Sequence, residues 1–93
     1  MIYAIKKSIK ADGYPVNSSK YLQAHRIANE LELKKYGISR YNVLKNLCRL
    51  IPKNELLGKH TKTGQIFISS RVPLQFRSQV LFHEQVEHSI MEQ

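Results

Sequence analysis

Two histidines and two glutamates fall within six residues near the C-terminal end of this 93-residue chain: His83, Glu84, Glu87 and His88. Imidazole and carboxylate groups are ligands for divalent metals, and a carboxylate can also act as a general base. The apolar residues around them recur with the period of a helix. Ionisable groups on an apolar helix face are costly to bury unless they are paired, protonated or bound to a metal. The segment therefore indicates a metal site if it faces the core.

A rotation of about 100° per residue gives each of these four side chains a place on the helix. His83 and Glu87, one turn apart, fall at the centre of the apolar stripe. Glu84 falls at the edge of the stripe, and His88 falls outside it. The pattern predicts that His83 and Glu87 face the core and need a partner, whereas His88 needs none.

A second histidine–glutamate pair belongs to the first long helix. His25 and Glu32 fall on the same face as Ala24 and Ala28. Small side chains at these two positions allow another helix to approach closely. If the first and last long helices pack together, the two histidine–glutamate pairs converge.

Capping and helix-breaking residues set the bounds of the helices. Ser18 and Ser19 offer N-caps for a helix through about Tyr36, and Gly37 follows that helix. Ser39 is predicted to cap a second helix, which runs to about residue 50 because the proline at position 52 cannot continue it.

The other elements have weaker signals in the sequence. In chain order they are a strand or ragged helix over 2–9, a turn over 12–15, a loop over 54–64 with a turn at Thr63-Gly64, a strand over 65–69, and a last helix that opens at Val72-Pro73. We therefore predict a single α+β domain over residues 1–93. It is mostly helical, with three main helices and a short strand or hairpin before the last helix.

The basic residues are unevenly distributed along the chain, whose formal net charge is +8. All 15 lysines and arginines lie within residues 6–77, against four acidic residues in that range, so residues 1–77 carry +11. A polycation of this density is attracted to phosphate backbones. The alternative is a charged surface without such a partner.

The single cysteine and the hydropathy of the chain indicate the cellular compartment in which the protein is expected. Cys48 excludes an intramolecular disulfide, as is typical of a reducing cytoplasm, and its apolar helix face predicts a small buried side chain. No apolar run is long enough to span a bilayer, and the N-terminal segment lacks a signal-peptide core. We expect a cytoplasmic protein without a membrane-spanning segment.

The segment His83-Glu84-Gln85-Val86-Glu87 resembles the HExxH motif of zincin metalloproteases, with glutamate in place of the second histidine. With His88 as the second histidine it also satisfies the HExxxH spacing of dipeptidyl peptidase III-like enzymes. That version requires a helix irregularity such as a π-bulge. The strand predicted before the motif helix is similar to the edge strand of the small ImmA/IrrE-like zincins.

The resemblance implies a divalent metal, with zinc as a candidate, and a metal-dependent hydrolase such as a peptidase or a degenerate, non-catalytic relative. His83 and Glu87 would be ligands, and Glu84 would be the general base that activates a metal-bound water. His88 would be a ligand in the longer motif. A further ligand would come from upstream, with His25 or His60 as the candidates.

Two other functions compete with the metal site. The helix, short turn and helix over residues 19–50 resemble a helix-turn-helix, which would bind nucleic acid through the basic face. The residues that would contact it are Arg40, Asn42, Lys45 and Arg49 on the second helix, and Lys59 and Lys62 beyond it. Alternatively, His83 and Glu87 form an ion pair that satisfies the small core or a helix interface, in a structural or protein-interaction module. A homodimer would complete the small core through the apolar helix faces.

Overall fold

The computed structural model describes residues 19–52 and 55–92. Its elements in chain order are α1 (Ser19–Tyr36), α2 (Ile38–Leu50), β1 (Gly58–His60), β2 (Ile66–Ile68), a 3₁₀ turn (Leu74–Phe76) and α3 (Arg77–Met91). The prediction of a mostly helical α+β fold, with three main helices and a hairpin before the last one, is confirmed. The elements predicted over 2–9 and 12–15, and Ser18 as a cap, lie outside the described residues.

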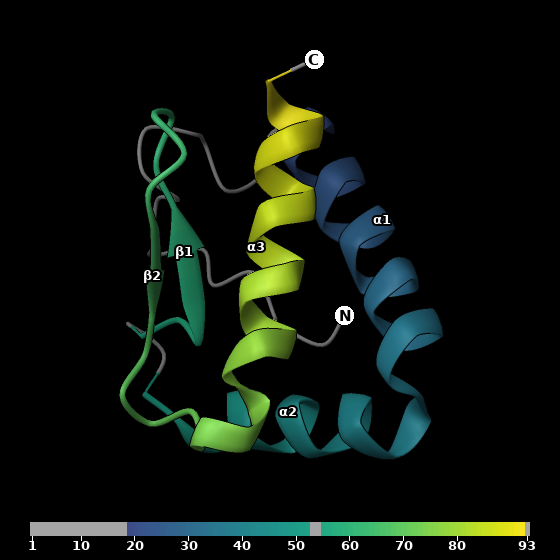
Figure 1. Ribbon diagram of the computed structural model, residues 1–93, viewed down its shortest axis with the longest axis vertical. Helices are drawn as coiled ribbons and strands as arrows, with labels where there is room; N and C mark the ends of the chain where they lie inside the picture. Colours follow the sequence, from purple (N-terminus) through teal and green to yellow (C-terminus); the bar gives the residue numbers. More distant parts are fainter. Residues whose placement is uncertain (1–18, 53–54, 93) are drawn as a thin grey trace.

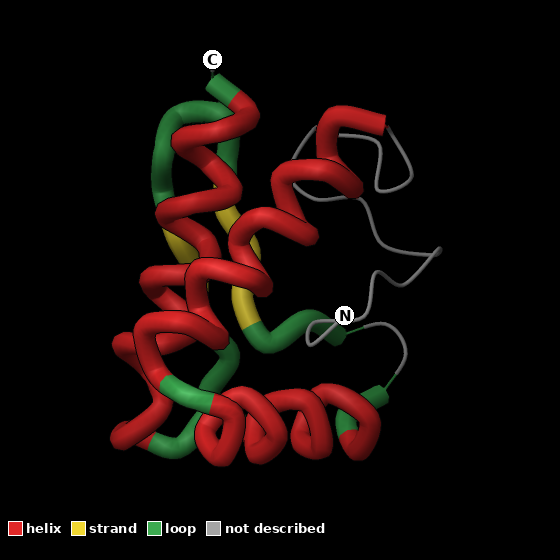
Figure 2. Tube along the Cα trace, turned by 90° about the vertical axis from the view of Figure 1, so that its right-hand side faces the viewer, coloured by secondary structure: helices red, strands yellow, loops and turns green. Residues whose placement is uncertain are grey.

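Helix α3 occupies the middle of the fold. It lies between α1 on one side and the β1–β2 hairpin on the other (Figure 1). Helix α2 crosses one end of α1 and α3, and the view turned by 90° shows the same arrangement (Figure 2). Side chains on two faces of α3 can therefore meet groups from both neighbouring layers.

The close contact between α1 and α3 follows from small side chains on α1. Ala24 and Ala28, one turn apart, are completely buried. A methyl side chain at each position leaves room for the second helix, as the sequence predicts. The same face of α1 is therefore held against α3, and the polar side chains on that face are removed from water.

The junction between α1 and α2 depends on one glycine. Gly37 has φ of +92°, a conformation that favours glycine, and its N–H donates to the carbonyl of Leu33 at 2.9 Å. Helix α2 begins directly afterwards at Ile38. The prediction of Ser39 as its N-cap is therefore wrong: Gly37 holds the cap position, and Ser39 lies within the first turn. The helix ends at Leu50 as predicted, because Ile51 is extended before Pro52.

The prediction of a loop over 54–64 is wrong at residues 58–60, which belong to a hairpin. Residues 58–60 form β1, which pairs antiparallel with β2 in the register Gly58↔Ile68 and His60↔Ile66. The predicted turn is present: the Gly64 N–H donates to the carbonyl of Thr61 at 3.0 Å, and Gly64 has φ of +92°. Two three-residue strands are too short for a strong periodic signal, so the sequence shows only the apolar β2.

The last helix begins later than predicted. Pro73 has an extended ψ of 146° and precedes a 3₁₀ turn over Leu74–Phe76, so α3 starts at Arg77. From there α3 is a regular α-helix to Met91.

The apolar core lies at the end of the fold where α2 crosses α3. It consists of buried side chains from α2, the connecting segments and the start of α3: Leu44, Cys48, Ile51, Leu57, Val72, Phe76 and Val80. The prediction that Cys48 is a buried hydrophobic side chain is confirmed. Within the described residues, no helix combines the length and the apolar composition needed to cross a membrane.

The glycine at the start of β1 allows the hairpin to approach α3. A Cβ on Gly58 would lie 2.6 Å from Cγ1 of Val80 and 3.1 Å from Cγ of Glu84. We expect Gly58→Ala to lower the free energy of unfolding by about 1–3 kcal/mol, because overpacking forces the strand away from the helix. Urea denaturation followed by circular dichroism measures this change.

Lys59→Ala is the matched control, since Lys59 is the next residue of β1 and its side chain is exposed. We expect it to change the free energy of unfolding by no more than about 0.5 kcal/mol. Equal effects of the two substitutions would show that the contact at Gly58 is not what limits the approach of the strand.

Candidate metal centre

Helix α3 carries three ionisable side chains to the interior. His83, Glu84 and Glu87 have exposed fractions of 0%, 4% and 1%. The burial of His83 and Glu87 agrees with their place in the apolar stripe. Glu84 is more buried than an edge position predicts, because β1 covers that side of α3. All three groups therefore need partners inside the protein.

Helix α1 supplies the partners on one side of α3. The Nδ1 atom of His25 lies 2.5 Å from Oε2 of Glu87, and Nε2 of His83 lies 2.6 Å from the same oxygen. The two ring nitrogens are 3.3 Å apart. The two histidine–glutamate pairs thus converge when α1 packs on α3, with one carboxylate oxygen between two imidazoles.

Strand β1 supplies a third imidazole on the other side of α3. Side chains alternate along β1, so Lys59 is exposed while His60 is completely buried. Nδ1 of His60 lies 3.0 Å from Oε1 of Glu84 and 3.8 Å from Oε1 of Glu87. Both upstream histidines proposed as a further ligand, His25 and His60, therefore reach the cluster.

The two oxygens of Glu87 face different neighbours. Oε2 meets the pair of imidazoles from His25 and His83. Oε1 points toward His60, is buried, and accepts no hydrogen bond from the residues that the structure describes. A buried carboxylate oxygen without a donor is costly, and a cation would satisfy it.

A second layer of polar groups fixes the orientation of His83. Its Nδ1 lies 2.9 Å from Oε1 of Glu32, and the Gln79 amide donates to Oε2 of Glu32 at 2.6 Å. With Nδ1–H donated to this carboxylate, Nε2 is the ring atom that lies against Glu87, and it would be able to bind a metal once it loses its proton. A carboxylate behind a histidine in this way orients metal-binding imidazoles and raises their basicity.

Gln79 is absent from the predicted site, although it precedes His83 by four residues and so shares its face of α3. Glu32 was expected to converge with the other groups but was not among the predicted ligands. Its contact with Nδ1 of His83 places it behind the imidazole, as a positioning residue.

The ionisable groups shift the pKa values of one another. Burial lowers the pKa of His83, but hydrogen bonds with Glu32 and Glu87, together with the negative charges of Glu87 and Glu84, outweigh burial and raise it to about 9. Burial raises the pKa of Glu84 above its ordinary value. Burial also acts to raise the pKa of Glu87, but hydrogen bonds from His25 and His83 outweigh this and lower it. The cluster therefore retains positive charge next to Glu87.

The donor set and its spacing are compatible with a divalent metal. His25 Nδ1, His83 Nε2 and Glu87 Oε2 form one group whose ligand atoms could hold an ion. Ligand atoms at about 2.0–2.1 Å from a tetrahedral zinc are about 3.3 Å from one another. The two imidazole nitrogens already have this spacing, whereas Oε2 would have to move away from each by several tenths of an ångström.

His88 is not brought into this group. It is half-buried on the next turn of α3, where its ring lies 5.6 Å from the ring of His60. The Nδ1 atom of His88 lies 4.0 Å from Glu92. Since α3 is regular through this segment, the irregularity that the HExxxH spacing requires is absent from α3.

The basic residues proposed to contact nucleic acid lie apart from the metal centre. Arg40 donates to the carbonyl of Gln75 and lies over the Phe76 ring, so it holds α2 against the start of α3. Asn42, Arg49, Lys59 and Lys62 are exposed, and Lys45 is half-buried. Binding of nucleic acid by these residues stays a prediction.

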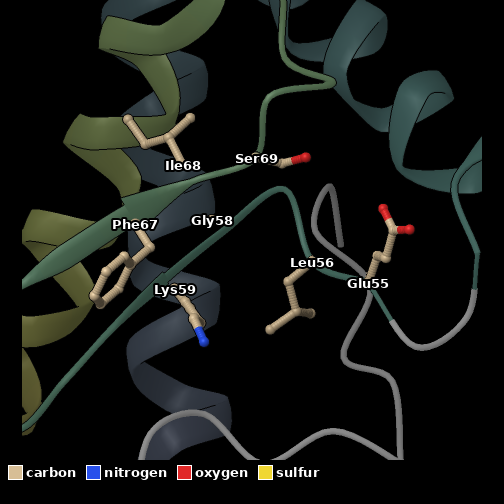
Figure 3. Close-up of a pocket in the computed structure, with 7 residues that line it drawn as sticks. All are labelled: Glu55, Leu56, Gly58, Lys59, Phe67, Ile68 and Ser69. Carbon is tan, nitrogen blue, oxygen red and sulfur yellow. The ribbon is translucent and has the colours of Figure 1, made fainter.

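A shallow pocket lies along the hairpin, next to Leu56 and Glu55 (Figure 3). The side chains of Lys59 and Phe67, which face each other across the strands, point to one side of the hairpin, and Ile68 points to the other. The Lys59 ammonium lies 5.4 Å from the centre of the Phe67 ring. None of the candidate metal ligands lines this pocket.

Comparison of the chain with protein-family models, with curated proteins and with solved structures finds no match. The resemblance to zincins therefore stays a prediction from the motif itself.

The raised pKa of His83 predicts how the stability of the metal-free protein depends on pH. The proton on His83 is bound more tightly in the folded state, so its contribution is complete below pH 6.5 and is lost as the pH rises through about 9. The charged neighbours responsible are Glu32 from α1 and Glu84 and Glu87 from α3. We expect the difference in Tm between the wild type and His83→Gln to shrink over this range, measured by circular dichroism with a chelator present.

His88→Gln is the control, because it removes an imidazole from the same helix outside the cluster. The difference in Tm between His88→Gln and the wild type should not shrink over this pH range. A Tm difference for His83→Gln that is constant from pH 6 to pH 9.5 would show that His83 does not hold an extra proton in the folded protein.

Proposed function

We propose that the protein binds a divalent metal ion in its interior, through His25 from α1 and His83 and Glu87 from α3. The observation that carries this proposal is the convergence of two imidazole nitrogens and one carboxylate oxygen, with Glu32 behind His83. Two histidines and one glutamate are a known ligand set of zinc sites in hydrolases. The set contains no sulfur, and it also suits manganese and iron.

A metal ion would also supply positive charge next to the buried carboxylates of the cluster. Three carboxylates, those of Glu32, Glu84 and Glu87, are buried together. No lysine or arginine is buried in the part of the chain that the structure describes. Among the described residues, protonated imidazoles are the groups that can supply positive charge near these carboxylates, and a bound cation would supply it in their place. With an ion bound, the histidines can be neutral ligands.

Hydrolysis is the reaction class that fits such a centre if the protein is an enzyme. A bound divalent ion would supply a water of lowered pKa as the nucleophile. In this version Glu84, whose pKa is raised by burial, lies beside Glu87 on the face of α3 toward His60 and would accept the proton. A degenerate relative would keep the ion for stability alone. Both versions require the same three ligands.

The proposal predicts that the metal and the stability are lost together when a ligand is removed. We expect His83→Ala purified without chelator or histidine tag to contain no stoichiometric metal by elemental mass spectrometry, whereas the wild type retains it. An ion at 100 times its Kd stabilises the folded state by about 2.7 kcal/mol. The wild type should therefore gain Tm on addition of zinc, and His83→Ala should not.

His88→Ala is the matched control, since it removes a histidine five residues further along α3 that lies outside the ligand group. It should keep the metal and the gain in Tm. Equal metal content in the wild type and both variants would place any bound ion elsewhere and would reject the proposed ligands.

A further inference from the structure

The cluster contains a second group of metal-binding atoms on the hairpin side of α3. His60 Nδ1, Glu84 Oε1 and an oxygen of Glu87 lie close enough to serve as ligands of one ion. Nδ1 of His60 lies 3.0 Å from Oε1 of Glu84 and 3.8 Å from Oε1 of Glu87, and these distances bracket the spacing of about 3.3 Å expected around a small divalent ion. All three residues are at least nine-tenths buried.

Glu87 belongs to both groups, but with a different oxygen in each. Oε2 lies among the imidazoles of His25 and His83, and Oε1 faces His60. Oε1 has no hydrogen-bond donor among the described residues, although it is completely buried. A carboxylate that presents its two oxygens to two sets of ligands is the arrangement that bridges paired metal ions, which lie about 3.5–4 Å apart in two-metal sites.

The charges of the cluster are compatible with two cations. A single divalent ion leaves the three buried carboxylates with one negative charge that is not balanced, if the histidines are neutral ligands. Two divalent ions bring the sum to one positive charge, so that no negative charge is left unbalanced. The second group also has two carboxylates and only one imidazole, whereas the first has two imidazoles and one carboxylate. An oxygen-rich set of this kind suits manganese or ferrous iron more than it suits softer metals.

We infer that the interior holds a dinuclear metal centre, in which Glu87 bridges one ion bound by His25 and His83 and a second ion bound by His60 and Glu84. This inference rests on the proposed function, because the bridge needs the first ion. It assigns Glu84 as a ligand of the second ion in place of its predicted role as general base. The bridging residue Glu87 lies on α3. The first ion takes its other protein ligands from α3 and α1, and the second ion takes them from α3 and β1.

The test is a manganese titration of the metal-free full chain. Electron paramagnetic resonance distinguishes two exchange-coupled Mn²⁺ ions from isolated ones, and elemental analysis after desalting gives the number bound. We expect two ions per chain with a coupled spectrum for the wild type and for His88→Gln. We expect one ion and an uncoupled spectrum for His60→Gln, which keeps the first ligand group.

The possible results separate the inference from the proposed function. One uncoupled ion in the wild type, kept in His60→Gln, would overturn the dinuclear centre and leave the single-ion proposal in place. No bound ion would overturn both. Two ions without coupling would also overturn the bridge, because ions that share Glu87 must interact. The wild-type spectrum alone decides between these results if His60→Gln does not fold.

Discussion

The need for positive charge in the interior governs this structure. Three carboxylates and three imidazoles are buried around the middle of α3, and the described lysines and arginines are all exposed or half-buried. Burying a carboxylate without a compensating charge costs several kcal/mol, which is comparable to the total stability of a domain of this size. Protons can supply the charge, as the raised pKa of His83 indicates. Divalent ions supply it without requiring imidazolium groups.

The rest of the fold brings these groups together and excludes water from them. Ala24 and Ala28 let α1 approach one face of α3, and Gly58 lets β1 approach another. Both approaches depend on small or absent side chains at the points of contact. The apolar core lies toward the crossing with α2, where Val80 is one turn before His83. The residues that provide hydrophobic stabilisation and the residues that form the polar centre are therefore different, although the two sets are adjacent along α3.

The sequence predicts the part of the site that depends on helical period. His83 and Glu87 are found at the centre of a buried face, and His25 joins them once α1 packs on α3, because all three follow from a 3.6-residue repeat. The position of His60 is not predictable in the same way. It depends on a three-residue strand whose pairing is a tertiary contact, so its segment resembles a loop. The role of Gln79 depends on its contact with a carboxylate from another helix, which no local pattern shows.

The most direct test of the metal centre is anomalous diffraction at the zinc absorption edge, from crystals of the full chain grown with zinc and without chelator. We expect an anomalous peak within bonding distance of Nδ1 of His25, Nε2 of His83 and a carboxylate oxygen of Glu87. Peaks confined to groups outside the cluster, such as His88, with the buried imidazoles still hydrogen-bonded to the carboxylates, would contradict this ligand set. The cluster would then be a proton-balanced structural network.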